Sequence, residues 1–270
     1  MKKNLFMAVL AAVLVVACSS ATLDEKKAKF QKDLETIVQD FTEACTAVET
    51  DTTLTNEQVQ AKCEDIYAKA QEKYTALCLK TLRKNRDNEL GVMAFKEVYN
   101  DLSLDEVEKY IGMLSPEMQD QDIIVRVKNH LVTLKKTAEG QMFTDFEVDG
   151  VKFSDFVGKG KYVLVDFWAS WCGPCKREVP NIKKAYETYA GDDFDVLSVA
   201  VWDDPEATKA TAAELGIVWN QIINAQRIAS EAYGFDSIPQ IMLFGPDGTI
   251  LKKGLRESAI EAAVKEALGR

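Results

Sequence analysis

The chain has 270 residues, of which 47% are hydrophobic and 28% are charged, and its formal net charge is −10. This composition is typical of a soluble globular protein and excludes wholesale disorder, and the length allows two domains of ordinary size after any leader is removed. The acidic balance argues against a nucleic-acid partner, because phosphate binding needs clustered Lys and Arg.

The first 17 residues have the three parts of a secretory signal peptide. Lys2 and Lys3 supply the positive end, residues 5–16 form an apolar run, and Ala17 is small. The run is too short to span a bilayer core of about 30 Å, so a retained transmembrane helix is not expected. We therefore predict that residues 1–17 are a signal peptide that is removed.

The four residues Val-Val-Ala-Cys that end at Cys18 resemble the lipobox of bacterial lipoproteins. The resemblance implies cleavage before Cys18, lipidation of Cys18 and a short tether over residues 18–22. Several acyl chains hold a protein at a membrane far more firmly than one chain does. The predicted location is therefore extracytoplasmic, as a membrane-anchored lipoprotein on the periplasmic side of a bacterial envelope. The alternative is an ordinary signal peptide with an incidental cysteine.

Residues 23–138 show helical periodicity and contain few helix breakers. The apolar residues of the first segment step by threes and fours and so line one helix face: Phe30, Leu34, Ile37, Val38, Phe41, Cys45 and Val48. Capping signals mark later helix starts, with Thr55 three residues before Gln58 and Ser115 directly before Pro116. The helix that begins at Pro116 is predicted to run to about Lys136. We expect a separate all-α domain, a small antiparallel helical bundle, whose role these residues do not indicate.

Three cysteines lie in this helical domain. Cys45 and Cys63 stand at similar separations before and after the predicted turn near Leu54. In an antiparallel hairpin these two positions lie at the same height on the apolar face, so a structural disulfide between them is geometrically plausible. The alternative is that they and Cys78 are three buried free thiols. These cysteines and the single histidine, His130, do not build a metal cluster, so no metal is predicted.

Residues 139–270 change to short alternating segments separated by Gly and Asp turns. The apolar run of residues 162–167 predicts a central strand buried on both faces. It leads directly into the sequence Trp-Cys-Gly-Pro-Cys-Lys of residues 171–176. The other predicted elements are, in chain order, a hairpin around residues 149–150, a helix over 176–189, a strand over 195–201, helices over 205–215 and 228–233, a hairpin of 241–244 with 249–253, and a helix over 257–268. This order indicates an α/β domain.

Cys172 and Cys175 stand where the central strand gives way to a helix. A helix N-terminus carries unpaired N–H groups and roughly half a positive charge, which favours a thiolate on the first cysteine. We therefore predict that Cys172 is an exposed nucleophile and that the more buried Cys175 resolves the mixed disulfide. Half of a zinc site is the alternative for a Cys-x-x-Cys pair, but this domain contains no other Cys or His. Neither a metal nor a cofactor is predicted.

Asp166 lies on the strand that leads into this dithiol. An inward carboxylate at this position would be poorly solvated and its pKa raised, so it could accept the proton of Cys175. The alternative is an aspartate that faces the solvent.

These residues together resemble a known family. Residues 165–176, with Pro180 five residues after Cys175, are similar to the thioredoxin active-site segment, and Ile238-Pro239 before an apolar strand resembles the cis-proline loop of the same fold. The stretch 193–234 is longer than in thioredoxin and contains an extra helix. This insertion resembles the TlpA/ResA-type branch of membrane-tethered thioredoxin-like proteins. The resemblance covers residues 141–270, about half of the chain.

The resemblance implies a thioredoxin-like fold for residues 139–270, with a central mixed sheet flanked by helices. It implies a redox-active disulfide between Cys172 and Cys175 in an active-site motif that also contains Trp171, Gly173, Pro174 and Lys176. It also implies that Pro239 is cis and that the backbone edge of Ile238 pairs with the substrate chain beside Cys172.

The leading interpretation is an enzyme, a thiol–disulfide oxidoreductase that reduces disulfides in partner proteins. A Gly-Pro spacer resembles that of thioredoxin, a strongly reducing protein at roughly −270 mV, and outside the cytoplasm such a reductase needs a membrane-borne electron donor. The alternatives are a dimeric disulfide isomerase or an oxidase that uses the same dithiol, and a non-catalytic binding lipoprotein on a thioredoxin scaffold. A peroxidase is less favoured, because Ala169 stands three residues before Cys172 where a threonine would be needed.

Overall fold

The structure is a computed structural model that describes residues 21–270. The predicted signal peptide and Cys18 lie outside the described residues. Among the helices from residue 21 onward, none is long and apolar enough to cross a membrane. The chain forms two compact units, one that ends at Gln121 and one of Asp122–Arg270.

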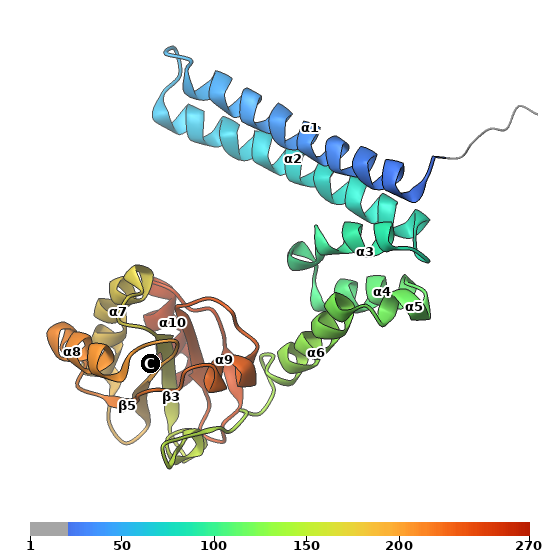
Figure 1. Cartoon of the computed structure of the whole chain (residues 1–270). Coiled ribbons are helices and arrows are strands. Elements are labelled where there is room, and N and C mark those ends of the chain that lie inside the picture. The colour runs from blue at the N-terminus through green and yellow to red at the C-terminus, as the bar shows by residue number, and fades with distance from the viewer. Residues whose placement is uncertain (1–20) are drawn as a thin grey trace, which may run out of the picture. The chain divides into compact units, whose positions relative to one another are not determined.

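The first unit is helical throughout. Its two longest helices, α1 and α2, form an antiparallel hairpin (Figure 1). Thr22 and Thr55 begin these helices with capping boxes, in which each threonine hydroxyl accepts the N–H of the residue three positions on. The elements of this unit are α1 (Leu23–Glu49), α2 (Asn56–Lys84), α3 (Glu89–Lys96), the 3₁₀ turn η1 (Tyr99–Asp101), α4 (Leu104–Met113) and α5 (Pro116–Gln119).

Burial along the α1–α2 hairpin is uneven. Phe30 and Leu34 of α1 and Cys78 and Leu82 of α2 are buried at the end of the hairpin that α3 covers. Between residues 37 and 74 no side chain of either helix is buried. We call this part, residues 37–74, the distal hairpin. Its apolar residues are only half-covered, because two helices alone cannot enclose them.

The helix predicted from Pro116 to Lys136 is interrupted, so that prediction is wrong in one respect. Ser115 caps only the short helix α5, and a second helix, α6 (Asp122–Lys136), begins after a turn at Asp120 and Gln121. The N–H of Asp120 bonds to the carbonyls of Pro116 and Glu117, and the N–H of Gln121 bonds to that of Met118. Two of these bonds span only three residues, and this 3₁₀-type pattern ends the α-helical hydrogen bonding.

Helix α6 belongs to the second unit, whereas the sequence predicts a domain boundary after residue 138. Hydrogen bonds directly after α6 account for this grouping. The Thr137 hydroxyl donates to the carbonyl of Tyr233 over 3.3 Å, and the Lys253 ammonium donates to the carbonyl of Thr137 over 2.9 Å. The chain is therefore anchored to the α/β unit before residue 139.

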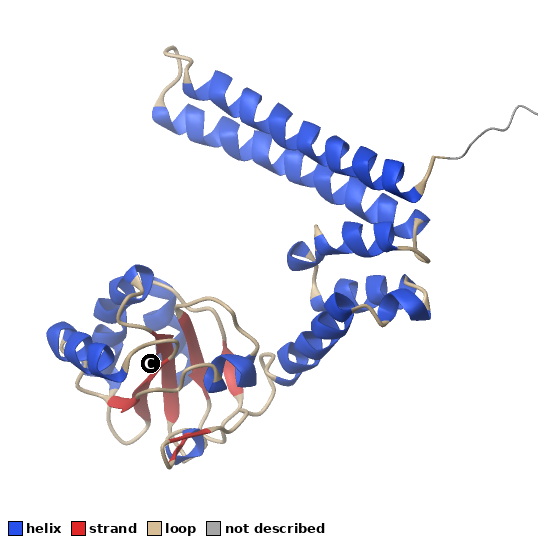
Figure 2. Ribbon diagram, in the orientation of Figure 1, coloured by secondary structure: helices blue, strands red, loops and turns tan. Residues whose placement is uncertain are grey.

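The second unit is built on a five-stranded mixed sheet in the order β5-β4-β3-β6-β7 (Figure 2). The central strand β3 is parallel to β4 and antiparallel to β6. A separate hairpin of β1 and β2 turns at Asp149-Gly150, where both residues have positive φ as a tight hairpin requires. The elements are β1 (Glu147–Val148), β2 (Val151–Lys152), the 3₁₀ turn η2 (Phe153–Asp155), β3 (Tyr162–Trp168), α7 (Gly173–Tyr189), β4 (Phe194–Ala200), α8 (Pro205–Leu215), β5 (Asn220–Ile222), α9 (Ile228–Tyr233), β6 (Gln240–Phe244), β7 (Ile250–Lys252) and α10 (Ser258–Leu268).

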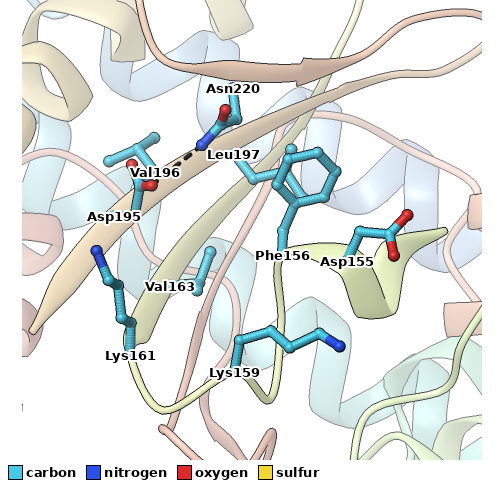
Figure 3. Close-up of a pocket in the computed structure, with 9 residues that line it drawn as sticks. All are labelled: Asp155, Phe156, Lys159, Lys161, Val163, Asp195, Val196, Leu197 and Asn220. Carbon is cyan, nitrogen blue, oxygen red and sulfur yellow. Dashed lines mark hydrogen bonds between the residues drawn. The ribbon is translucent and has the colours of Figure 1, made fainter. Parts of the chain in front are cut away.

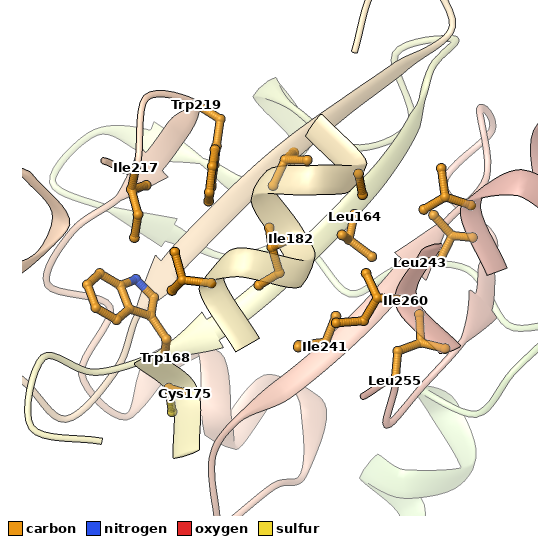
Figure 4. Packing of buried hydrophobic residues seen from close by; sticks show 14 of the residues in the cluster. Leu164, Trp168, Cys175, Ile182, Ile217, Trp219, Ile241, Leu243, Leu255 and Ile260 are labelled. Atoms are coloured by element: carbon orange, nitrogen blue, oxygen red, sulfur yellow. The ribbon is translucent and has the colours of Figure 1, made fainter. Parts of the chain in front are cut away.

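Both faces of this sheet are covered. Leu164 and Trp168 of β3 belong to an apolar cluster with α7, α8 and α10, and part of this cluster is drawn in Figure 4. Val163 and Phe167 belong to a second cluster, with α9 and the β1–β2 hairpin, on the other face. The alternation follows from the two-residue period of a strand, and it explains why the run 162–167 is continuously apolar.

The prediction of a thioredoxin-like α/β fold preceded by a helical region is confirmed. Strand β5 was not predicted, because it has only three residues at a sheet edge and pairs with β4 alone. Such a short segment has too few alternations to show a strand period.

Two helical glycines of the first unit give a matched test of its packing. A Cβ added at Gly91 would lie 2.0 Å from the backbone oxygen of Asn85, whereas one added at Gly112 meets nothing within 4 Å. Gly91→Ala is therefore expected to lower the free energy of unfolding of the full chain by about 1–3 kcal/mol. Gly112→Ala is expected to raise it by up to about 1 kcal/mol through helix propensity. Urea unfolding followed by far-ultraviolet circular dichroism measures both, and equal effects of the two variants would contradict this packing.

Candidate active site

The dithiol lies where β3 ends and α7 begins. Cys172 is the N-cap of α7, Gly173 and Pro174 open the first turn, and Cys172 is disulfide-bonded to Cys175 with the two Cα atoms 5.3 Å apart. The N–H of Cys175 donates to Cys172 Sγ over 3.1 Å. The first sulfur therefore takes the place of a capping side chain at the positive end of the helix.

The two sulfurs are less accessible than predicted. Cys175 is fully buried beside Trp168 in the cluster under α7 (Figure 4), and Cys172, expected to be exposed, is only 3% exposed in this disulfide-bonded form. Part of the reason is the loop before β6, where the carbonyl oxygen of Ile238 lies 3.8 Å from Cys172 Sγ. The bond between Ile238 and Pro239 is cis. The fold thus brings the dithiol next to the backbone of Ile238-Pro239, as the resemblance implied.

Trp171 forms the exposed rim of this site. Its side chain is 60% exposed, and its indole N–H donates to the carbonyl of Trp202 over 2.9 Å. Lys176, also part of the predicted motif, lies half-buried in the first turn of α7. An exposed indole held in place by its own N–H presents a flat apolar surface directly beside Cys172.

Asp203 fixes the segment before the dithiol, and the sequence analysis did not identify it. Its carboxylate accepts hydrogen bonds from the Ser170 N–H at 2.6 Å, the Ser170 hydroxyl at 2.8 Å and the Thr208 hydroxyl at 2.7 Å. Although burial opposes ionisation, these bonds hold the pKa of Asp203 below its ordinary value. An aspartate directly before Pro205 is a sequence signal for a helix cap. That cap is Asp204, so the signal does not indicate the role of Asp203.

Asp166 is fully buried on β3, so the alternative of a solvent-facing aspartate is excluded. By strand alternation its side chain lies on the sheet face of Leu164 and Trp168, the face that α7 and Cys175 cover. Neither carboxyl oxygen has a hydrogen-bond partner. Burial raises the pKa of Asp166 from 3.8 to about 8, with the charge of Arg256 opposing the rise and that of Glu178 adding to it.

A polar cavity of about 480 Å³ adjoins the dithiol, and two residues that line it were also missed by the sequence analysis. The Arg256 guanidinium donates to the carbonyls of Leu255 and Pro239, and so supports the loop that contacts Cys172. Glu178, on α7, accepts the N–H of Glu257 over 2.9 Å. No spacing pattern links residues so far apart in the chain, so only the folded structure shows that they meet.

A second cavity, of about 220 Å³, lies at the opposite end of the central strands (Figure 3). It is lined by Lys161 at the start of β3 and by Asp195 at the start of β4, and Asn220 donates to Asp195 over 3.0 Å. It contains no cysteine or histidine. Over residues 21–270, no group of three or more His, Cys, Asp or Glu side chains is arranged to hold a metal ion. Within residues 122–270, Cys172 and Cys175 are the only cysteines.

The remaining predicted site residues lie in the first unit or outside the described residues. Cys45 on α1 and Cys63 on α2 carry free thiols, one helical turn beyond the ring contact between Phe41 and Tyr67. The two positions face each other as the hairpin geometry predicted, and their oxidation to a disulfide stays a prediction. Lipidation of Cys18 also stays a prediction.

The second half of the chain is similar to a family model and to several known proteins. A family model described as the AhpC/TSA family matches residues 135–253. The thiol-disulfide oxidoreductase ResA of Geobacillus thermodenitrificans is 29% identical over 121 residues, which cover 45% of this chain and 68% of that protein. ResA of Bacillus subtilis is 28% identical over 102 residues, 38% of this chain and 56% of that protein. A solved structure, the thioredoxin domain of a thiol-disulfide oxidoreductase from Bacteroides vulgatus, is 30% identical, covers 48% of this chain and 96% of that one, and has a TM-score of 0.43.

The buried carboxyl of Asp166 makes a prediction about stability and pH. Its pKa is about 8 in the folded protein and near 3.8 when unfolded, so the folded state binds the proton more tightly. This contribution is fully present below about pH 4 and is lost as the pH rises to about 8, an effect on the order of several kcal/mol. Asp166→Asn removes this titration.

Urea unfolding of the oxidised proteins between pH 5 and pH 9 tests this. The free energy of unfolding of the wild type, relative to Asp166→Asn, is expected to fall across this range and to level off above about pH 8. A difference that does not change with pH would show that Asp166 titrates normally.

Proposed function

Because the second unit of this chain is a thioredoxin-like domain of the TlpA/ResA type of thiol–disulfide oxidoreductases, we propose that it reduces disulfides in partner proteins through Cys172 and Cys175. The observation that carries the proposal is the position of this pair at the N-terminus of α7, above a buried and unpaired carboxyl, Asp166. The substrate class is disulfide-containing proteins, as the family implies.

The reaction begins with the reduced dithiol. The Cys172 thiolate attacks one sulfur of a substrate disulfide, the substrate's S–S bond breaks, and its second sulfur leaves as a thiolate. Cys175 then attacks Cys172 Sγ, which releases the first substrate sulfur and closes the Cys172–Cys175 disulfide seen in the structure. The positive N-terminus of α7 supports the thiolate on Cys172, and the N–H of Cys175 already donates to that sulfur.

Asp166 is proposed to hold the proton that Cys175 must lose before it attacks. A carboxyl with a pKa of about 8 is matched to this task at neutral pH, because it exchanges a proton with a thiol without a large energetic penalty. Asp166→Asn should slow release of substrate from the mixed disulfide by about 10²-fold and leave the attack by Cys172 unchanged. Stopped-flow kinetics with a disulfide peptide separate the two steps, and an unchanged rate of release would remove Asp166 from the mechanism.

Substrate is proposed to bind across the rim of Trp171 and along the backbone edge of Ile238. The Ile238 carbonyl lies 3.8 Å from Cys172 Sγ, so an extended substrate chain paired with this edge brings its disulfide to the attacking sulfur. The Arg256 guanidinium supports this edge by donating a hydrogen bond to the carbonyl of Pro239. The exposed indole of Trp171 supplies an apolar contact beside it.

The protein is proposed to act outside the cytoplasm as a lipoprotein, with its electrons supplied by a donor in the membrane. This rests on the lipobox resemblance at Cys18 and on the need of an extracytoplasmic reductase for a continuous electron source. Mass spectrometry of the mature N-terminal peptide tests the anchor. An acylated Cys18 that is absent from a Cys18→Ala variant is expected, and an unmodified N-terminus would contradict the anchor.

Two serine variants test the proposed reaction. Cys172→Ser is expected to reduce turnover of a disulfide peptide to the uncatalysed rate, because the attacking thiolate is gone. Cys175→Ser is expected to accumulate a covalent mixed disulfide through Cys172, because the resolving thiol is gone. The matched control is Cys45→Ser/Cys63→Ser, which removes two thiols of the first unit and should keep full activity. Activity in Cys172→Ser, or a substrate trapped on any other cysteine, would overturn the proposed function.

A further inference from the structure

A second pair of thiols, Cys45 and Cys63, lies in the helical first unit. Cys45 and Cys63 occupy facing positions on the antiparallel helices α1 and α2. The rings of Phe41 and Tyr67 pack across the two helices with centroids 6.0 Å apart, and each cysteine lies four residues nearer the connecting turn. Both side chains are half-exposed, so a reagent in solution can reach them. Cys78, the third cysteine of this unit, is fully buried. Burial raises its pKa to about 12, so it remains a protonated thiol in the core.

Little buried packing surrounds this pair. Cys45 and Cys63 both belong to the distal hairpin, in which no side chain is buried. Contacts with the end of α3 and with η1 are made at the other end of this segment, where Tyr74 donates to Glu97 and Gln71 donates to Asp101, both over 2.7 Å. A two-helix layer without a third element opens at low cost in free energy, because few apolar contacts are lost when it opens. A disulfide between Cys45 and Cys63 would restrain the distal hairpin, which has no buried side chains to hold it.

We propose that Cys45 and Cys63 are a second, oxidisable thiol pair, which closes a disulfide between α1 and α2 and locks the distal hairpin. The oxidant is a disulfide, either a small one of the glutathione class or the oxidised form of another thiol–disulfide oxidoreductase. This inference does not depend on the proposed reductase activity, because neither Cys172 nor Cys175 takes part in it.

The chemistry balances with one oxidant disulfide. The thiolate of one cysteine attacks a sulfur of the oxidant, whose S–S bond breaks and releases one thiol. The thiolate of the other cysteine then attacks the protein sulfur of this mixed disulfide and displaces the second thiol. One S–S bond forms between Cys45 and Cys63, one S–S bond of the oxidant breaks, and two electrons and two protons pass to the oxidant.

The setting of this pair differs from that of Cys172 and indicates a structural bond. Cys45 and Cys63 lie within their helices, whereas Cys172 caps one. Desolvation, the neighbouring thiol of Cys63 and the negative charge of Glu49 raise the pKa of the Cys45 thiol. A thiol that ionises poorly exchanges slowly. The bond between Cys45 and Cys63 is therefore expected to form slowly.

Peptide mapping of the full chain tests the pairing. The variant Cys172→Ser/Cys175→Ser, which leaves only the cysteines of the first 120 residues, is equilibrated with oxidised glutathione, alkylated without reduction and digested. A linked peptide that contains Cys45 and Cys63, two hydrogens lighter than its reduced parts, is expected, with Cys78 alkylated only after unfolding. Alkylation of both Cys45 and Cys63, or a separate glutathione adduct on each, would overturn the proposal.

A second measurement tests the locking of the hairpin and uses single variants as matched controls. Amide hydrogen exchange in the distal hairpin is expected to be at least about tenfold slower in the oxidised protein than after reduction. Cys45→Ser and Cys63→Ser, which cannot form the bond, should show the fast exchange under both conditions. Equal exchange in oxidised and reduced wild type would refute the lock. Loss of peptide reduction in Cys172→Ser would not bear on it, so the two proposals fail separately.

Discussion

The junction between β3 and α7 is the constraint on which the rest of the second unit depends. The strand is buried on both faces, and only residues 169–172 separate its end from the first residue of α7. The same few residues therefore place Cys172 on the positive end of a helix and Asp166 inside a dry core below it. The helix N-terminus would support a thiolate on Cys172 once the disulfide is reduced, while burial raises the pKa of the Asp166 carboxyl to about 8. The environment thus favours the charged form of the Cys172 thiol and the neutral form of the Asp166 carboxyl. The attacking group and the group that holds a proton are therefore different residues.

Other elements keep this junction in place. Strand β6 pairs with β3 and so brings Ile238 to the Cys172 sulfur, and Asp203, in the loop after β4, fixes the backbone of Ser170 just before the dithiol. Arg256 closes the arrangement by bonding to the carbonyl of Pro239. The site is thus assembled from the loops after β3, β4 and β7 and the loop before β6, and hydrogen bonds to backbone atoms hold them together.

The residues that could be predicted from sequence are those whose role is local. Cys172 and Cys175 share one helical turn, and Asp166 stands a few positions earlier on a run whose apolar pattern already indicates burial. Asp203, Glu178 and Arg256 could not be predicted, because their partners lie far away in the chain and only tertiary packing brings them together. The exposure of Cys172 was predicted wrongly for the same reason, since the loop that covers it comes from residue 238. The helix break at Asp120 was missed because a capping residue marks where a helix starts and does not fix its length.

The reduction potential of the Cys172–Cys175 pair is the most direct measure of the central claim that this dithiol is a reductant. We would use the full chain with the substitutions Cys45→Ser/Cys63→Ser, so that only the Cys172–Cys175 pair contributes to the measurement. The protein is equilibrated with dithiothreitol or glutathione buffers, and the reduced fraction is measured by alkylation. A thiolate supported by the helix and a Gly-Pro spacer predict a value near or below roughly −250 mV. A value between roughly −180 and −120 mV would contradict the account and would make the protein an oxidase or an isomerase.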